Sequence, residues 1–477
     1  MTLLSPARLL ASVLPRRLRV VPAPSPHAAS GPGPQGSGFR NGFSALAHRN
    51  YRLYIGGQVI SQVGSWMQSV SQPWLVLTLG GTPLQLASVL ALQFLPPAFL
   101  APLGGVLADR VDKRRALMTV QVLALAQAAT LFALVVTGNV EMWHIYVLAA
   151  VLGVANAVDM PLRHSFVAEL VPPRDLMNAI ALNSAAFNSA RIIGPAVAGV
   201  LIAVVGLAWS FGINAISYFA VLAGLWLMVG SQLHREVGVR EQPPVLRSLR
   251  EGVHYATATP IVLWPLVLLF GMATFGMNFQ TLLPLLARDT LMLGADGYGA
   301  LYAAMGVGAL LGSLSLAFLG NRRPLMPFMI GGGMAFVAFE IIFGMSRALP
   351  LVFGSVMLVG LFSMLMVNTI NVTIQSNVNH ALRGRIMSLY TTVFAGSAPV
   401  GGLLAGFMAE TIGAPAAFII GASAAGVFVL LVGWQLLRRF GLYRINAGTP
   451  VSEMDGPIPA IAAPDDRKPE GPVSAAG

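Results

Sequence analysis

Long apolar runs recur along nearly the whole of this chain, and they constrain its fold more than any other feature. Of its 477 residues, 56% are hydrophobic and only 10% are charged, and the mean hydropathy is +0.73. Soluble domains carry roughly 25% charged residues. Each run approaches the roughly 20 residues with which a helix crosses about 30 Å of hydrocarbon, whereas a membrane β-barrel has short alternating segments. The sequence therefore predicts an all-α integral membrane protein, with the lipid bilayer as its first partner.

The apolar runs predict twelve membrane-spanning helices. Because twelve is an even number, both termini are expected on the same side of the membrane. The spans cover roughly residues 53 to 79, 84 to 107, 116 to 137, 143 to 162, 178 to 205, 209 to 229, 261 to 287, 297 to 319, 325 to 345, 349 to 376, 385 to 411 and 414 to 437.

The basic residues indicate which side carries the termini. Of the 29 lysines and arginines, only Arg191, Arg288 and Arg347 lie outside the N-terminal segment, the loops on its side and the C-terminal tail. Cytoplasmic loops carry such an excess of positive charge, so both termini are expected in the cytoplasm and the chain in the plasma (inner) membrane. This topology also accounts for the net charge of +11. No nucleic-acid partner is expected, because no basic groove or stacking module is visible.

Composition divides the chain into five segments. Residues 1–45 and 441–477 are expected to be disordered cytoplasmic tails. The first contains "SGPGPQGSG" near its end, and the second is rich in Pro, Ala and acidic residues. The first tail is rich in arginine and has no acidic residue, so it resembles a mitochondrial transit peptide in composition. A flexible tail, or a start codon chosen too far upstream, is the alternative. Residues 46–230 and 261–440 each hold six spans.

Residues 231–260 form the linker between the two sets of spans, and an amphipathic helix is expected in it. Leu246, Leu249 and Val253 recur at helical spacing beside Arg247 and Arg250. Such a helix lies on a membrane surface with its apolar side in the lipid, here on the cytoplasmic side.

An internal repeat supports the division into six and six. A shift of 207 residues superimposes glycines and one arginine in equivalent spans, which indicates a duplicated six-helix unit. The matched pairs are Gly105 and Gly312, Arg115 and Arg322, Gly153 and Gly360, Gly194 and Gly401, Gly199 and Gly406, and Gly206 and Gly413.

The loop after the second span carries a family signature, "GGVLADRVDKRRAL". It resembles the Gly-x-Leu-Ala-Asp-Arg-x-Gly-Arg-Lys loop of the major facilitator superfamily, with Asp112 where that pattern has glycine. The resemblance implies two parallel six-helix bundles with a substrate site between them near the bilayer midplane. It also implies that Asp109 helps to hold the cytoplasmic side shut, although topology alone could explain the cations. The predicted cytoplasmic gate comprises Gly105, Asp109, Arg110, Lys113, Arg114, Asp159 and Arg163.

The fifth span places a cation deep in the membrane. Arg191 lies about 13 residues, or roughly 20 Å, from the cytoplasmic end of the span, which is too deep for its side chain to reach the surface. Ser184 and Asn188 share its face of the helix. We expect Arg191 to meet an anionic or polar substrate or a coupling carboxylate, but not Asp159, which is predicted at a different depth.

The segment "GPAVAG" follows Arg191 directly, and Gly194, Pro195 and Gly199 are expected to bend and pack the helix. It resembles the Gly-Pro signature in the fifth span of drug/proton antiporters of the superfamily, although packing alone is an alternative. Together with "NAVDMPLRHSFVAELV", it resembles the branch that contains enterobactin exporters and macrolide efflux proteins.

Polar stripes on several spans predict a shared cavity. Polar side chains in hydrocarbon need partners or water, so each stripe faces either another helix or the cavity. Further members of the first and seventh stripes are Ser69, Thr274 and Thr281. The predicted substrate-cavity residues are Arg191, Asn188, Ser184, Gln58, Gln62, Ser65, Gln72, Asn278, Asn368, Asn371 and Gln375.

Two acidic residues are candidate proton sites. Asp159 precedes Arg163 by one helical turn, so a simple ion pair is the alternative for it. Glu340 lies within the ninth span without an obvious local partner, and burial favours the protonated form of a carboxyl group.

The predicted function is secondary active transport by alternating access, and proton-coupled export of amphiphilic small molecules such as drugs, macrolides or siderophores is favoured. An importer or facilitator on the same fold is the first alternative, and a transporter-like sensor the second. No nucleotide-binding, metalloprotease or nucleophile-elbow motif is present, so no enzyme, cofactor or metal is predicted. The protein is expected to act as a monomer.

Overall fold

The structure is a computed structural model that describes residues 43–234, 245–318 and 325–440. It describes no side chains at 101–110, 245–249, 317–318, 325, 380–381 and 440. The predicted C-terminal tail and almost all of the N-terminal tail lie outside the described residues. Met1–Ser44 forms a unit separate from Ala45–Gly477. The long helices all belong to the second unit, whose described part contains helices and no strand.

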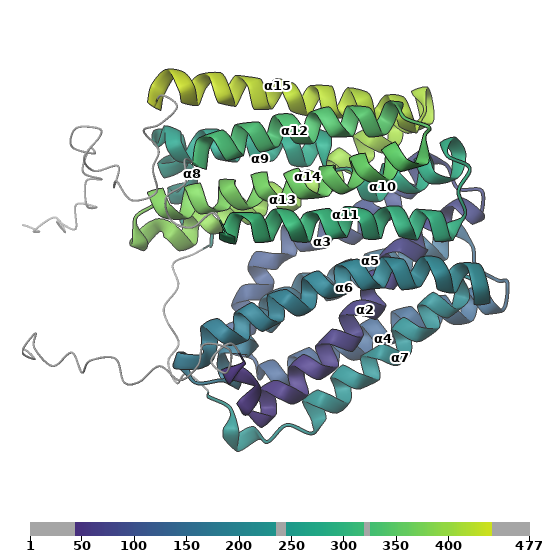
Figure 1. The fold of residues 1–477 in the computed structure, drawn as a ribbon. Coiled ribbons are helices and arrows are strands. Elements are labelled where there is room, and N and C mark those ends of the chain that lie inside the picture. The colour runs from purple at the N-terminus through teal and green to yellow at the C-terminus, as the bar shows by residue number, and fades with distance from the viewer. Residues whose placement is uncertain (1–42, 235–244, 319–324, 441–477) are drawn as a thin grey trace, which may run out of the picture. The chain divides into compact units, whose positions relative to one another are not determined.

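Six long helices form the first part of this unit, and we call them the N-terminal helices (Figure 1). They are α2 (Arg49–Thr78), α3 (Pro83–Arg110), α4 (Lys113–Val136), α5 (Met142–Leu170), α6 (Leu176–Val205) and α7 (Ala208–Trp226). Short 3-10 turns lie at Ser44–Ala47, Pro173–Asp175 and Gly230–Gln232. The linker helix is α8 (Val245–Ala258).

The C-terminal helices begin with a broken span. It consists of α9 (Pro260–Gly271), the π-turn η5 (Met272–Gly276), α10 (Phe279–Leu285) and the π-turn η6 (Leu286–Thr290). Five continuous helices follow, namely α11 (Ala295–Phe318), α12 (Leu325–Met345), α13 (Leu349–Asn377), α14 (His380–Ile412) and α15 (Ala414–Phe440).

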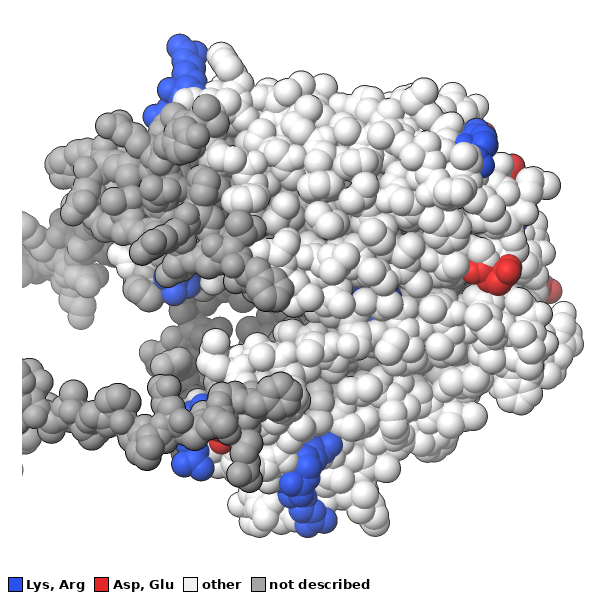
Figure 2. Space-filling model, in the orientation of Figure 1, with Lys and Arg blue, Asp and Glu red and all other residues white. Residues whose placement is uncertain are grey.

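Eleven helices of the described chain are long and apolar enough to cross a membrane. α2 has the length but a lower hydropathy, because it carries the polar stripe predicted for the first span. It packs against α6 and α7, so we count it as the first of twelve spans. In Figure 2 most visible charged side chains lie toward the two ends of the helices, and the belt between them is almost uncharged. The predicted all-α membrane fold is confirmed.

Two spans differ from their prediction. The seventh, predicted as one helix over roughly 261 to 287, breaks at Met277 and Asn278. The Asn278 side chain stabilises the break, because its Nδ2 donates to the carbonyl of Thr274 at 2.8 Å. The fourth, predicted to end at residue 162, continues as α5 to Leu170. Asp159 therefore lies well inside the helix rather than near its end.

The glycines matched by the internal repeat occupy equivalent contacts. A Cβ on Gly153 of α5 would lie 2.7 Å from the Gln93 carbonyl oxygen of α3, and one on Gly360 of α13 would lie 2.0 Å from that of Met305 in α11. Only glycine allows backbones to approach this closely. The two helix pairs are thus packed by the same device.

The matched glycines of α6 and α14 also correspond. Gly194 of α6 packs against α2, and Gly401 of α14 packs against η5 of the seventh span. Gly206 and Gly413 follow the two helices with φ of 97° and 87°, a conformation that favours glycine. Both parts of the repeat therefore end this helix in the same way.

The helical bundle has two ends, which we call the tail end and the far end. The tail end is where α2 begins and α15 ends, and the far end is where α2 ends and α15 begins. α6 and α11 lie close together toward the far end and diverge toward the tail end (Figure 1).

Candidate transport site and its closed end

The N-terminal and C-terminal helices are joined by glycine contacts between α6 and α11. A Cβ on Gly199 would lie 3.0 Å from the Ala295 carbonyl oxygen, and one on Gly299 would lie 2.6 Å from that of Pro195. Because α11 begins at Ala295, these contacts lie toward the far end. The predicted packing motif therefore has two sides: Gly194 faces α2, whereas Pro195 and Gly199 face α11.

Polar and aromatic contacts strengthen the same end. Glu410 of α14 accepts hydrogen bonds from the Thr82 hydroxyl and the Leu84 amide, both at 2.9 Å. Arg288 of η6 donates to the Leu77 carbonyl at 2.7 Å. Trp74 of α2 stacks on Tyr298 of α11 with ring centroids 5.5 Å apart. The far end of this structure is therefore closed.

Arg191 lies just on the tail side of this closure. Its guanidinium carbon is 5.9 Å from the centre of the Trp66 ring in α2, and its Nη1 is 4.0 Å from the Met364 sulfur in α13. Its Nε is buried without a hydrogen-bond partner. No ion pair among the described side chains involves Arg191, and Asp159 pairs with Arg163 instead.

Polar residues of α6 and α13 continue from Arg191 toward the tail end. On α6, Asn188 and Ser184 follow at one-turn intervals on the same face; Asn188 is half-buried and Ser184 exposed. The Asn188 amide donates to the Ser184 carbonyl at 2.8 Å. These side chains leave the α6 face beside Arg191 polar and open.

The matching face of α13 carries Met364, Asn368, Asn371 and Gln375 at intervals of 4, 3 and 4 residues. The three polar side chains are half-buried. Asn368 donates to the Ser313 hydroxyl of α11 at 3.3 Å, and Gln375 donates to Asn371 at 2.6 Å. Because Met364 contacts Arg191, the structure brings this predicted stripe and that of α6 to the same region.

The predicted α2 residues have mixed surroundings. Gln62 and Ser69 lie one turn on either side of Trp66, so they share the face that meets Arg191. Gln58 is buried, and its Oε1 has no partner in the described chain. Ser65 is exposed, with its hydroxyl 3.4 Å from that of Tyr218 in α7.

A buried amide network, which the sequence pattern missed, occupies another side of α2. Gln68 donates to Gln127 of α4 at 3.0 Å and accepts from Asn214 of α7 at 2.6 Å. Gln72 is buried beside it, with its Oε1 3.5 Å from Gln68 Nε2. Gln68, Gln127 and Asn214 lie on three different helices, so no periodic pattern in the sequence links them. Gln72 thus faces the interior of the N-terminal helices.

The stripe of the seventh span is also buried. Asn278, Thr274 and Thr281 are all nearly inaccessible, and Gly401 and Gly402 of α14 pack against them. Asn278 uses its amide donors on its own backbone. These three residues are placed to shape the helix break and its packing on α14.

The gate residues whose side chains are described contact the N-terminal helices. Lys113 forms an ion pair with Glu169 of α5 at 2.6 Å, and Arg114 donates to the last carbonyls of α7, at Leu225 and Trp226. Asp112, the departure from the family pattern, caps α4 by accepting from an amide of its first turn at 3.1 Å. Gly105, Asp109 and Arg110 lie in the last two turns of α3, where the structure describes the backbone alone.

Asp159 and Arg163 form an ion pair within α5. Gln121 of α4 donates to the other Asp159 oxygen at 2.8 Å. On the same helix, Phe166 packs edge-on against the Tyr54 ring of α2, with 5.9 Å between the ring centroids. The pair that the sequence offered as the alternative for Asp159 is therefore present. Glu340 differs, because it is buried in α12 and one of its carboxylate oxygens has no partner in the described chain.

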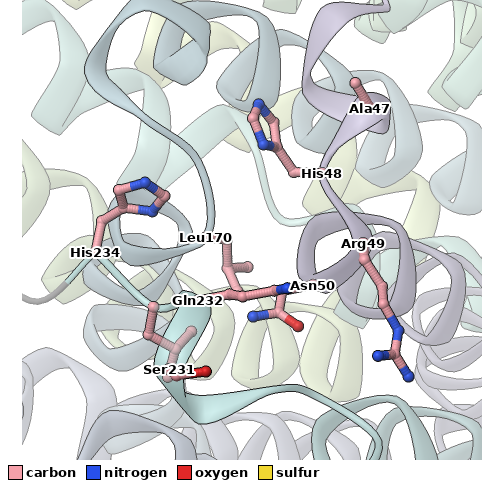
Figure 3. A pocket seen from close by; sticks show the side chains of 9 residues that line it. Ala47, His48, Arg49, Asn50, Leu170, Ser231, Gln232 and His234 are labelled. Carbon is pink, nitrogen blue, oxygen red and sulfur yellow. The ribbon is translucent and has the colours of Figure 1, made fainter.

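A pocket of about 500 Å³ opens elsewhere, at the tail end of the N-terminal helices (Figure 3). His48 and Asn50 line one side, and Ser231, Gln232 and His234 another. His48 pairs with Asp175 at 2.8 Å, and Asn50 bonds the Val229 backbone. None of the predicted site residues lines this pocket. No cluster of three potential metal ligands occurs in the described chain.

Solved structures of transporters share this fold. A crystal structure of the nucleoside transporter NupG aligns with a TM-score of 0.66 at 13% identity, over 80% of this chain and 98% of that chain. At this identity the likeness concerns the fold alone. This fold and the family match over residues 40–474 together identify the chain as a transporter of the major facilitator superfamily rather than an enzyme.

The family follows from the sequence comparison. The model of the family described as "Transmembrane secretion effector" matches residues 40–474, so the chain belongs to that family. The Staphylococcus aureus staphyloferrin A transporter is 28% identical over 77% of this chain and 92% of its own. The Escherichia coli enterobactin exporter EntS is 28% identical over 70% and 78%. The uncharacterized Bacillus subtilis transporter YfiS is 27% identical over 44% of this chain, and the match spans 49% of that relative.

Proposed function

We propose that the protein is a proton-coupled exporter of amphiphilic small molecules that carry an anionic or strongly polar group, of the siderophore or drug type. The observation that carries the proposal is Arg191, a cation at mid-membrane depth whose Nε is buried without a partner. A charge inside a membrane protein is costly unless it meets a partner or a wet cavity. The transported molecule is the partner we assign to it.

The surroundings of Arg191 support an amphiphilic ligand. Trp66 supplies an aromatic face, and Met364 a deformable apolar surface. Amide groups of Asn188 and Asn368 continue the site toward the tail end. Relatives named for enterobactin and staphyloferrin A fit this choice, since siderophores combine many polar groups in one small molecule.

Alternating access is supported by the closed far end and by the glycine contacts that form it. In this mechanism the site opens to one side at a time, and the present structure is a state sealed at the far end. Gly105, Asp109, Arg110, Lys113, Arg114, Asp159 and Arg163 are our proposed gate at the tail end. We assign the tail end to the cytoplasm because of its positive charge. On this assignment both termini are cytoplasmic. We also propose that the protein is a monomer and that it lies in the plasma membrane.

We further propose two six-helix domains, 46–230 and 261–440, joined by the linker 231–260. α8 packs on α9 and α14, and Glu251 of α8 forms an ion pair with Arg385 of α14. These contacts favour a linker that moves with the second domain.

Transport into inverted membrane vesicles tests the function. Vesicles that contain the protein take up a labelled probe, with enterobactin, staphyloferrin A and a macrolide tried in turn, while an inside-acid pH gradient is imposed. We expect uptake that depends on the gradient and collapses with a protonophore. Uptake of an accepted probe that ignores the gradient would remove proton coupling, and accumulation only in right-side-out vesicles would identify an importer.

Arg191→Gln tests the site. Hydrogen bonds to charged groups contribute about 1.5–3 kcal/mol, so we expect the apparent affinity for an accepted anionic probe to fall roughly tenfold to 150-fold. Arg174→Gln is the control, because that side chain is exposed. Equal affinities in Arg191→Gln and the wild type would remove Arg191 from the binding site.

A further inference from the structure

Glu340 is a buried carboxyl group that the transport site at Arg191 does not use. It is 1% exposed, and its Oε2 has no hydrogen-bond partner in the described chain. It lies about one and a half turns from the far end of α12. An ionised carboxylate in such a place is strongly disfavoured unless a cation joins it.

Aromatic residues flank Glu340 along α12. Phe336 and Phe343 lie one turn before and one turn after Glu340 on the same face of α12. Both pack against Phe279, with ring centroids 6.3 Å and 6.5 Å away. Phe418 of α15 completes the cluster at 5.4 Å from Phe279. Because Phe279 is the first residue of α10, the cluster holds the segment that follows the break in the seventh span.

The carboxyl group also faces the break itself. A Cβ on Gly276, the last residue of η5, would lie 3.4 Å from Glu340 Oε2. Helix ends leave carbonyl groups without intrahelical donors, and Asn278 satisfies two of them, those of Thr274 and Phe275. Glu340 therefore lies where the seventh span can bend.

On the helices that pack near Glu340, the described charged side chains lie toward the helix ends or pair with one another. α13, which packs against α12, contains no charged or titratable residue. On α15 the charges are Arg438 and Arg439 at the tail end. The seventh span carries Arg288 and Asp289, which pair with each other. Arg347, beyond the end of α12, bonds the carbonyls of Gly344 and Ser346.

The segment after the break reaches the N-terminal helices. α10 contacts α2 and α3, and Arg288 of η6 donates to the Leu77 carbonyl at the end of α2. A change in the bend at Met277 and Asn278 therefore acts directly on the closure of the far end.

We propose that Glu340 is the proton-binding site of this transporter, and that its proton stabilises the closed far end by keeping the aromatic cluster around the helix break dry. The proposal rests on the proposed function, to which it adds the coupling residue and the moving part. Loss of the proton leaves a charge that needs water, and water reaches Glu340 only when α10 separates from the cluster.

The sign of the pH effect follows. The charged form is penalised in the closed arrangement, so acid favours a closed far end and alkali an open one. For one proton, the ratio of open to closed molecules changes by at most about tenfold per pH unit. A proton taken up at the far end would thus convert an exporter to the state that faces the tail end.

Spin-label distances test this without knowledge of the substrate. The sequence has no cysteine, so Val204→Cys in α6 and Met345→Cys in α12, both exposed at the far end, give one labelled pair. Distances are measured in lipid nanodiscs between pH 5 and pH 9. We expect short distances at acid pH and a growing long-distance population as pH rises.

Glu340→Gln is the decisive variant, since it keeps the shape and removes the charge. We expect it to give the short distances at every pH, while the matched control Glu141→Gln, on an exposed residue, behaves as the wild type. A pH-dependent shift that persists in Glu340→Gln, or distances that do not change with pH in the wild type, overturns the proposal. A shift that follows Na⁺ at constant pH also overturns it.

Chemical labelling gives a second readout. N,N′-dicyclohexylcarbodiimide adds to protonated carboxyl groups in apolar surroundings, and the adduct is located by peptide mass spectrometry. We expect modification at Glu340 that declines as pH rises. Vesicle transport separates the two proposals: gradient-driven uptake that is unchanged in Glu340→Gln refutes the role of Glu340 alone. A Glu340-dependent distance shift without gradient-driven uptake refutes proton-coupled transport alone.

Discussion

Gly299→Ala should open the far end of the transporter. In the closed structure the added Cβ would lie 2.6 Å from the Pro195 carbonyl oxygen and 2.8 Å from the Gly199 Cα. Both contacts are to backbone atoms of α6, which cannot rotate away as a side chain can. The two helices must therefore separate wherever they form this contact.

The size of the effect follows from the overpacking. Inserting a methyl group into a tightly packed interior costs about 1–3 kcal/mol. If the cost applies only to the state with a closed far end, the ratio of open to closed molecules rises about fivefold to 150-fold. Spin labels at Val204→Cys and Met345→Cys measure this ratio directly, and the long-distance population should grow at every pH.

Gly354→Ala is the matched control, because a Cβ there meets nothing within 4 Å. It should leave the distances unchanged. If Gly299→Ala gives the same distance distribution as Gly354→Ala, the contact between α6 and α11 is not specific to the closed state, and this account of the far end is wrong.

Two further substitutions test local packing through thermal unfolding in detergent. Gly308→Ala should lower the midpoint strongly, because its Cβ would lie 1.8 Å from the Met357 carbonyl oxygen and overpacking costs about 1–3 kcal/mol or more; a midpoint equal to that of Gly354→Ala would contradict this. Asp112→Ala should cost about 1 kcal/mol because α4 loses its N-terminal cap, and Arg115→Gln, which keeps the capped amide, should unfold like the wild type.

Local sequence properties were sufficient to predict the helices and several of the positions at which the helices pack. Hydrophobic length predicts a span because the bilayer has a fixed thickness. The same hydrophobic length placed Arg191 near the middle of its helix, and the offset of 207 residues identified glycines that make equivalent contacts. The break in the seventh span was missed, because it depends on how Asn278 bonds its own backbone and packs on Gly401.

Partners across the bundle could not be predicted in the same way. Periodicity says that a face is polar but not which helix it meets, so the α2 stripe gave no sign of the network from Gln68 to Gln127 and Asn214. Glu410 and Thr82 are separated by most of the chain, and no local pattern links them.

The sequence by itself determined that the chain crosses a membrane and that an arginine lies near the middle of its fifth span, because hydropathy and helical rise are properties of each segment alone. Only the tertiary structure decided that Arg191 meets Trp66 and Met364 beside a closed far end, and that Glu340 faces the break at Gly276. These contacts join separate helices, and the free energy that selects them comes from packing between helices rather than from the residues of any one segment.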